Sequence, residues 1–470
     1  MRKRFSFGPL LPDLPPAGQC IVASNVLPVK DGYGSVQSFK AITPALPAIC
    51  GGAAFVASDG TTAFLAGDHN ALWRYSGSAW AQQFVAVTAD RWRFAQYGDL
   101  IPCVHGGAPI KFNLLTGTAA LIGGSPPNAD LVATVRDFTL LAGDPAAKNK
   151  VSWCGFNNLD QWSATDNQAG SQNLLDGGEI MGLAGGEYGI VLQRNAIKRM
   201  TYVGAPIVFQ FDAISTNIGC MAKGSVAQAG RLVFFLSERG FHICDGNDVT
   251  PIGAEKIDRT FFATYSRQDI EAGLYAAVDP RRNVVMWAMP GKPGRIWCYS
   301  WTLDRWSTID IDLSLVFSGF TANVGLDAID GLYGNLDAVP GSLDDPAFAG
   351  GNPLLLVATR AGVVGSLAGR AMDGTLGLAR VELTDGRARV RTLRPVTDAA
   401  AVTATLGGAA RADNLPATAI GASMRSNGDI PVRINARELT PALTFSNGTS
   451  DRDWTYATAV DLEWEEGGRR

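Results

Sequence analysis

The sequence is poor in the side chains that carry most metal-binding and catalytic chemistry. Its 470 residues include only three histidines, His69, His105 and His242, and none has a second histidine at metal-ligand spacing. The seven cysteines form no C-x-x-C pair, and their odd number favours buried, reduced thiols over a disulfide framework. We therefore expect neither a zinc site nor a disulfide scaffold.

Motifs for phosphate binding and nucleophilic catalysis are also missing. There is no P-loop, no G-x-G-x-x-G segment after a strand and no G-x-S-x-G elbow, which Gly365-Ser366-Leu367-Ala368-Gly369 resembles only superficially. Asp245-Gly246-Asn247-Asp248 has too few alternating oxygen ligands for a calcium loop. These absences predict a protein with no cofactor and no nucleophilic mechanism.

Charge and long apolar runs are scarce as well. Charged residues make up 18% of the chain, and 40 Lys and Arg against 44 Asp and Glu give a net charge of -4. A protein that grips nucleic acid through its phosphates needs an excess of positive charge, so that mode is disfavoured. No segment approaches ~18 consecutive apolar residues, and the N-terminus lacks the apolar run of a signal peptide. We expect a soluble protein made in a reducing cytosol.

Glycine, proline and hydrophobic residues are abundant, and one sequence frame is repeated. The chain has 54 Gly, 24 Pro and 46% hydrophobic residues, which suits short strands joined by tight turns. The frame W-C-x(4)-L-D-x-W-S begins at Trp153 and again at Trp297, and a shorter relative runs from Trp73 to Trp80. The intervals are roughly multiples of a 40 to 50 residue period, which is typical of β-propeller blades.

These patterns predict an all-β fold: a β-propeller of about six or seven blades, with a small β-sandwich-like region formed by the C-terminal segment and the N-terminal arm. Residues 1–48 are proline-rich and are expected to form an extended arm. The propeller is expected over 49–384 and the C-terminal β region, an assembly platform, over 385–470. A stretch rich in Gly, Pro and Asp, at about 327–352, is expected to be an inserted loop.

Five tryptophans mark corresponding positions in the predicted blades: Trp80, Trp153, Trp162, Trp297 and Trp306. A tryptophan that recurs at one blade position, inside a strand, favours packing between neighbouring sheets. The alternative is an aromatic platform that binds sugars.

Two basic clusters are candidates for assembly contacts: Arg2, Lys3 and Arg4, and then Arg387, Arg389, Arg391 and Arg394. The second cluster alternates at strand period, which is typical of one face of a strand. That face either meets solvent or contacts another subunit or a partner protein.

An enzymatic interpretation would need a pair of carboxylates facing a sugar cleft, as in propeller glycosidases. Ser58-Asp59-Gly60-Thr61-Thr62 loosely resembles the S-x-D-x-G-x-T-W box of sialidases, but it lacks the final tryptophan and occurs once. No pattern selects a pair from the 44 acidic residues. The chain is predicted not to be an enzyme.

Several stretches resemble the packaged-DNA stabilisation protein, or tail nozzle (hub), of short-tailed, podovirus-type bacteriophages. The similar stretches are Asn25-Val26-Leu27-Pro28-Val29 with Gly32-Tyr33-Gly34, Val135-Arg136-Asp137-Phe138 leading through Trp153 to Trp162-Ser163, Gly182-Leu183, and the segment from Ile190 to Met200. The resemblance covers roughly residues 20–260, with weaker similarity in the last 85 or so.

The resemblance implies a structural virion protein of the phage tail, synthesised in the cytoplasm of the host bacterium. It implies a homohexamer below the portal and its adaptor ring, which forms the lower DNA channel, retains the packaged DNA and allows its ejection. Tail fibre, tailspike or needle proteins are the further partners implied. The net charge agrees, because an acidic channel lets viral double-stranded DNA slide without specific binding.

Two other functions remain open from the sequence. One is a β-propeller module of a phage tail that binds glycans or a host receptor, with the tryptophans as its platform. The other is an enzyme that acts on polysaccharide through a carboxylate pair.

Overall fold

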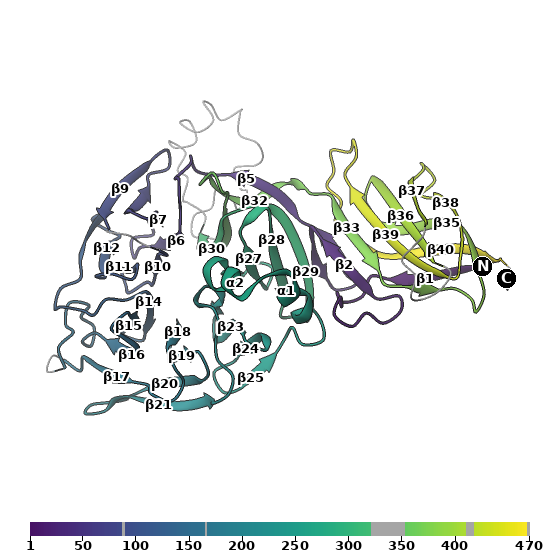
Figure 1. The fold of residues 1–470 in the computed structure, drawn as a ribbon. Helices are drawn as coiled ribbons and strands as arrows, with labels where there is room; N and C mark the ends of the chain where they lie inside the picture. The colour runs from purple at the N-terminus through teal and green to yellow at the C-terminus, as the bar shows by residue number, and fades with distance from the viewer. Residues whose placement is uncertain (87–89, 165–166, 321–352, 410–417, 468–470) are drawn as a thin grey trace.

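The computed structural model describes residues 1–86, 90–164, 167–320, 353–409 and 418–467. Within these residues the regular structure is almost entirely β-strand, and the strands form two bodies, a propeller and a sandwich (Figure 1). The all-β prediction of a propeller with an added sandwich is confirmed. The inserted loop predicted at about 327–352 lies outside the described residues.

Seven blades make up the propeller in the described part of the chain, and each has four antiparallel strands, with the first near the centre and the last at the rim (Figure 1). Blades 1 to 3 are β6 (Gly51–Val56), β7 (Thr62–Gly67), β8 (Ala71–Tyr75) and β9 (Trp80–Val85); β10 (Arg93–Phe94), β11 (Leu100–Val104), β12 (Ile110–Asn113) and β13 (Thr118–Leu121); and β14 (Leu131–Val135), β15 (Phe138–Asp144), β16 (Ala147–Trp153) and β17 (Gly170–Asn173). Blades 4 to 6 are β18 (Ile180–Ala184), β19 (Gly189–Gln193), β20 (Ile197–Gly204) and β21 (Val208–Ser215); β22 (Ala227–Ala229), β23 (Leu232–Ser237), β24 (Gly240–Cys244) and β25 (Val249–Pro251); and β26 (Tyr275–Asp279), β27 (Val284–Met289), β28 (Gly291–Ser300) and β29 (Arg305–Leu313).

Blade 7 combines strands from two distant parts of the sequence. Its members are β30 (Leu315–Phe320), β31 (Pro353–Ala358), β32 (Val364–Ala371) and β5 (Gln37–Ala41). β5 runs antiparallel to β32, with Phe39 opposite Leu367. A segment that precedes blade 1 in the sequence therefore completes the last blade and closes the propeller.

The sandwich is built from both ends of the described chain. Its first sheet has the order β3 (Val26–Val29), β4 (Gly32–Ser35), β40 (Ala457–Glu466), β35 (Ala388–Thr397) and β38 (Ile430–Ala436), with β1 (Arg2–Ser6) also paired to β40. Its second sheet has the order β2 (Cys20–Ser24), β33 (Gly374–Leu378), β39 (Glu438–Ser446), β36 (Ala401–Ala409) and β37 (Thr418–Ser423), with β34 (Val381–Glu382) paired to β39. Alternating residues along these strands are buried, as expected for two packed sheets.

The second sandwich sheet and blade 6 are one continuous ten-stranded sheet. β2 pairs in parallel with β29, where Ser24 lies opposite Thr308, and pairs antiparallel with β33 on its other side. Asn25 strengthens this junction, because its backbone N–H donates to the Thr308 carbonyl at 2.7 Å and its Oδ1 accepts from the Asp310 N–H at 2.8 Å. The two bodies are therefore joined by a sheet instead of a hinge.

One apolar core also crosses the junction. The largest cluster of buried side chains includes Trp287 and Trp306 from blade 6, Phe241 from blade 5, and Phe7 and Tyr33 from the N-terminal segment. The Trp287 and Trp306 rings stack at 5.6 Å. The Tyr33 hydroxyl donates to the Trp306 carbonyl at 3.3 Å, so the N-terminal segment is part of the core.

Two predicted boundaries are wrong. Residues 1–48 do not form a single arm: β1 to β4 join the sandwich, as predicted for the arm, but β5 belongs to blade 7. The propeller does not extend to 384, because β33 and β34 pair with β2 and β39 of the sandwich. Both errors have one cause: a short strand does not reveal which distant strand it pairs with.

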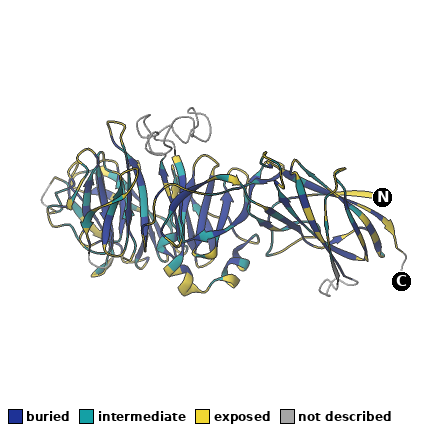
Figure 2. Cartoon of the chain, turned by 90° about the horizontal axis from the view of Figure 1, so that it is seen from above, coloured by how far each residue is buried: buried dark blue, intermediate teal, exposed yellow. Residues whose placement is uncertain are grey.

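Two short helices, α1 (Asp258–Thr264) and α2 (Arg267–Gly273), lie between blades 5 and 6 and project from one face of the propeller (Figure 2). Asp13 fixes the N-terminal segment to α1, since its carboxylate accepts the Arg259 and Thr260 backbone N–H groups, each at 2.8 Å.

Asp258, the first residue of α1, is buried. Its Oδ1 accepts the Phe241 N–H at 3.1 Å, and its Oδ2 has no partner among the described residues. Burial raises the pKa of Asp258 to about 6.

The Asp258→Asn variant is expected to be more stable than the wild type at pH 8 and equally stable near pH 4. The folded-state pKa of Asp258 lies above the unfolded value of about 3.9, so its stabilising contribution is present below that value and is lost as the pH rises through about 6. Asparagine never ionises and avoids this loss. Thermal unfolding across this pH range measures the effect, and a stability difference that does not change with pH would contradict the assignment.

Candidate functional site

The N-terminal basic residues lie on the first sandwich sheet. β1 pairs with β40, with Arg4 directly opposite Asp461. Arg4 Nε lies 2.8 Å from Asp461 Oδ1, and Arg2 forms a second ion pair with the same carboxylate, whose side chain is only 3% exposed. Hydrogen bonds from Arg4 and Arg2 hold the pKa of Asp461 below its usual range, although burial opposes them. These two arginines clamp strand β1 to the sheet.

The remaining predicted assembly residues are distributed around the same sheet. Lys3 Nζ donates to the Glu382 carbonyl at 3.5 Å. On β35, Arg391 and Arg394 form ion pairs with Glu465 and Asp429, each at 2.6 Å. Arg387 and Arg389 are also exposed. The structure thus brings both basic clusters together on one sheet, although almost the whole chain separates them.

Four of the five marker tryptophans lie in third or fourth blade strands. Trp153 in β16 and Trp297 in β28 are buried in third strands, while Trp306 in β29 and Trp80 in β9 lie in fourth strands. The Trp153 ring meets Phe209 of the next blade edge to face at 5.2 Å. Trp306 Nε1 donates to the Ile252 carbonyl, near the end of blade 5, at 3.0 Å. Both contacts join neighbouring blades.

Trp162 departs from the expected position. It lies in the loop between β16 and β17, half-buried, with Nε1 donating to the Leu159 carbonyl at 2.7 Å. The expectation that both copies of the frame place their second tryptophan inside a strand is therefore wrong. In blade 6, Asp304 ends a tight turn and β29 begins at Arg305, but in blade 3 the next strand begins only at Gly170.

Replacing Trp306 by alanine is expected to lower the free energy of unfolding by about 3 to 5 kcal/mol, the usual cost of removing a buried tryptophan. The matched Trp162→Ala change is expected to cost less than about 1.5 kcal/mol, because that side chain is only half-buried. Urea unfolding followed by circular dichroism compares the two variants. Equal losses would contradict the different roles that the structure gives to these residues.

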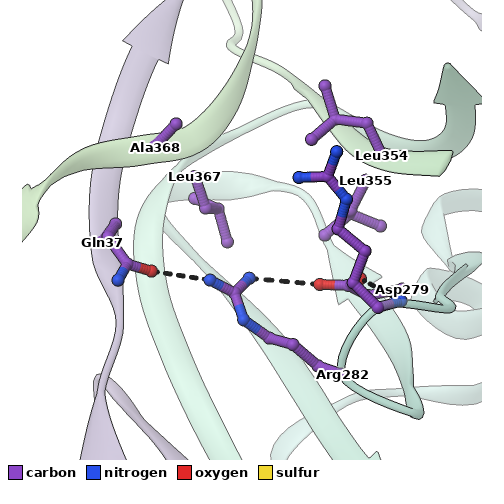
Figure 3. A pocket seen from close by; sticks show the side chains of 8 residues that line it. Gln37, Asp279, Arg282, Leu354, Leu355, Leu367 and Ala368 are labelled. Carbon is purple, nitrogen blue, oxygen red and sulfur yellow. Dashed lines mark hydrogen bonds and ion pairs between the residues drawn. The ribbon is translucent and has the colours of Figure 1, made fainter. Parts of the chain in front are cut away.

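A small cavity of about 310 Å³ lies between blades 6 and 7 (Figure 3). Its lining residues are Gln37, Asp279, Arg281, Arg282, Leu354, Leu355, Leu367 and Ala368. Arg282 spans it, with one nitrogen 3.1 Å from the Asp279 carboxylate and another 2.7 Å from Gln37 Oε1. Since Gln37 belongs to the strand that closes the propeller, this cavity lies at the closure point. Asp279 neutralises Arg282, so Arg281 is the lining guanidinium that could attract a small anionic ligand over the apolar floor.

A network of charged side chains crosses the centre of the propeller at one end. Arg91, which precedes blade 2, donates to the Leu274 carbonyl, which precedes blade 6, at 2.9 Å. Lys223, which precedes blade 5, lies 2.6 Å from the carboxylate of Asp130, which precedes blade 3. Arg93 donates to the Asp130 carbonyl at 2.6 Å, and burial lowers its pKa to about 10.

The contact of Arg91 with Leu274 joins blades 2 and 6, and that of Lys223 with Asp130 joins blades 5 and 3; neither pair of blades is adjacent, so these two contacts cross the centre of the propeller. Sequence reasoning missed the network because its members are scattered residues near the first strands of blades 2, 3, 5 and 6. Only the closed ring brings them together.

The histidines and cysteines have structural surroundings. His105 and His242 are buried, which lowers the pKa of both, and His242 Nδ1 lies 2.9 Å from the Gly240 carbonyl. All seven cysteines are buried and unpaired. Within the described ranges, no three His, Cys, Asp or Glu residues are placed to hold a metal ion. The described helices are all too short or too polar to cross a membrane.

Comparison with protein-family models and with curated proteins finds no match. Among solved structures, the chain is similar to the WD40 repeats of RRP9, with 10% identity over 60% of this chain and 88% of that one and a TM-score of 0.38. It is also similar to BBS1N from a complex with ARL6DN, with 10% identity over 71% and 97% of the two chains and a TM-score of 0.41.

PorZ, a surface component of the type-IX secretion system of Porphyromonas gingivalis, is a third similar structure. It is 10% identical over 84% of this chain and 46% of PorZ, with a TM-score of 0.38. Identities this low concern the fold alone. The chain is a β-propeller protein, and the strand pairing described above establishes this class directly.

Proposed function

We propose that this chain is a structural virion protein, the subunit of a homohexameric tail nozzle that lies below the portal and adaptor ring of a short-tailed phage. The observation that supports it best is the continuous ten-stranded sheet from blade 6 into the sandwich. A ring subunit that holds pressurised DNA must keep its propeller fixed relative to the platform that anchors it. A shared sheet and a shared core provide that rigidity without a hinge.

In this proposal the DNA passes through the central channel of the six-subunit ring and not along the axis of a single propeller. Arg91 and Lys223 reach partners across the propeller axis, so that axis is not an open passage at this end. In a ring of six copies the central space is shared by all subunits. A net charge of -4 on each keeps the ring acidic, which disfavours binding of the phosphate backbone. The adaptor ring and the fibre, tailspike or needle proteins would contact its two ends.

The purified full-length chain is expected to form a six-fold ring, alone or on an adaptor complex. Native mass spectrometry gives the number of subunits, and class averages from electron microscopy give the symmetry. Trp162→Ala serves as a control, because it should leave the core and the ring intact. A chain that stays monomeric at high concentration and is absent from phage particles would rule out this function.

The cavity between blades 6 and 7 supports a second candidate, a tail module that binds glycans or a host receptor. Arg281, which forms no ion pair within the described residues, favours an acidic sugar over a neutral one. Trp306 is fully buried and cannot be a sugar platform, whereas Trp80 and Trp162 are partly exposed.

A glycan array with acidic and neutral sugars tests this candidate. If it is correct, acidic glycans bind, and Arg281→Ala weakens that binding by about tenfold while leaving thermal stability unchanged. Hits lost instead on Trp80→Ala or Trp162→Ala would place the sugar at the tryptophans. Absence of any hit would leave the nozzle as the better-supported function.

A further inference from the structure

The face of the first sandwich sheet that points away from the core carries a row of arginines. Strand alternation leaves four arginines exposed on β35 and β38: Arg389, Arg391, Arg394 and Arg433. The residues between them, such as Val390 and Val432, are buried at no more than 1% exposure. We call these four residues the arginine face. Strands β35 and β38 lie in the part of the sandwich away from the propeller (Figure 1).

The arginines of this sheet differ in how they are held. Arg2 and Arg4 are committed to the buried Asp461. Arg391 and Arg394 have exposed or half-exposed partners, Glu465 and Asp429, and such surface pairs are weak.

For Arg389 and Arg433 no ion pair is formed within the described residues. Arg389 lies directly opposite Asn435 on one neighbouring strand and Glu465 on the other, and Glu465 already pairs with Arg391. Two of the four arginines therefore have no ion-pair partner within the described residues.

The basic residues in the C-terminal part of the chain are all arginines. Residues 374–470 contain 12 arginines and no lysine. Arginine presents a planar fork that binds carboxylates through two parallel hydrogen bonds, and it is enriched at protein interfaces from which lysine is depleted. Lysine would serve a merely solvated strand face equally well, so the composition favours contact with carboxylates.

We propose that the arginine face docks an acidic surface of a partner protein, and this inference rests on the proposed role of the sandwich as an assembly platform. The mixture of positive and negative side chains on this sheet favours a protein over DNA as the ligand. Glu463 and Glu465 are exposed on β40, beside the arginines, where they would repel a continuous row of phosphates. A protein surface can place carboxylates opposite the arginines and avoid the glutamates, which gives specificity as well as attraction.

The double variant Arg389→Glu/Arg433→Glu tests the proposal, with Arg239→Glu/Arg360→Glu on the propeller as a control of equal charge change. All four side chains are exposed. A decaglutamate peptide is the probe for an acidic protein surface, and a short DNA duplex is the probe for phosphates. Binding of the full-length chain to each is measured by interferometry at low and at physiological salt.

We expect the face variant to bind decaglutamate about tenfold more weakly than the wild type, and the control variant to bind it nearly as well. The DNA duplex should bind weakly to all three proteins. The melting temperature should stay within about 2 °C of the wild type in both variants, because exposed arginines contribute little to stability. Arg2→Ala/Arg4→Ala, in contrast, should lower the melting temperature, since it leaves Asp461 buried without a partner.

Equal loss of decaglutamate binding in the face and control variants would overturn the proposal, as would tighter binding of the duplex than of the peptide. Subunit number is measured in parallel by native mass spectrometry. A face variant that loses a wild-type ring would also overturn it, because the face would then contact a second copy of the chain. If the wild type forms no ring but the face still selects decaglutamate, the nozzle proposal fails and the docking surface stands.

Discussion

The rest of the structure depends on the position of strand β2 between β29 of the propeller and β33 of the sandwich. Without it, blade 6 would end at an open edge and the sandwich would lose the first strand of its second sheet. An exposed edge presents unpaired N–H and C=O groups and invites pairing with other chains. The five-residue strand β2 therefore covers the edge of blade 6 and joins the propeller to the sandwich.

The same N-terminal segment performs three further tasks within about forty residues. β1 and β4 pair with β40, Asp13 fixes the loop between β1 and β2 to helix α1, and β5 completes blade 7. Each of these contacts spans hundreds of residues in sequence. Closing such long loops is slow, so the N-terminal segment is expected to dock late, after most blades have formed.

What the sequence could predict follows from which contacts are local. Trp153 and Trp297 mark third strands because a blade is a local unit of hairpins, and its repeat is visible along the chain. Trp162 shows the limit of this signal. The same sequence frame places Trp306 inside strand β29, which begins at Arg305, but leaves Trp162 in a loop, because β17 begins only at Gly170.

Non-local pairing has no such signal in a single sequence. The expected sandwich from both chain ends is present. The sequences of β5 and β33, however, do not indicate that β5 belongs to the propeller and β33 to the sandwich. The central network around Asp130 and the cavity at Gln37 are invisible for the same reason.

The arginines of the two basic clusters differ in whether the neighbouring carboxylate is buried, and this difference decides which of them can bind a partner. Arg4 and Arg389 are both exposed strand arginines next to carboxylates, but Asp461 is buried and Glu465 is not. A buried carboxylate without its cation is costly, so Arg4 cannot leave Asp461 to bind a partner without weakening the sandwich. An exposed glutamate loses little when its arginine turns to a new carboxylate. Arg2 and Arg4 are therefore committed to the fold, whereas the arginine face on β35 and β38 is free to take part in recognition.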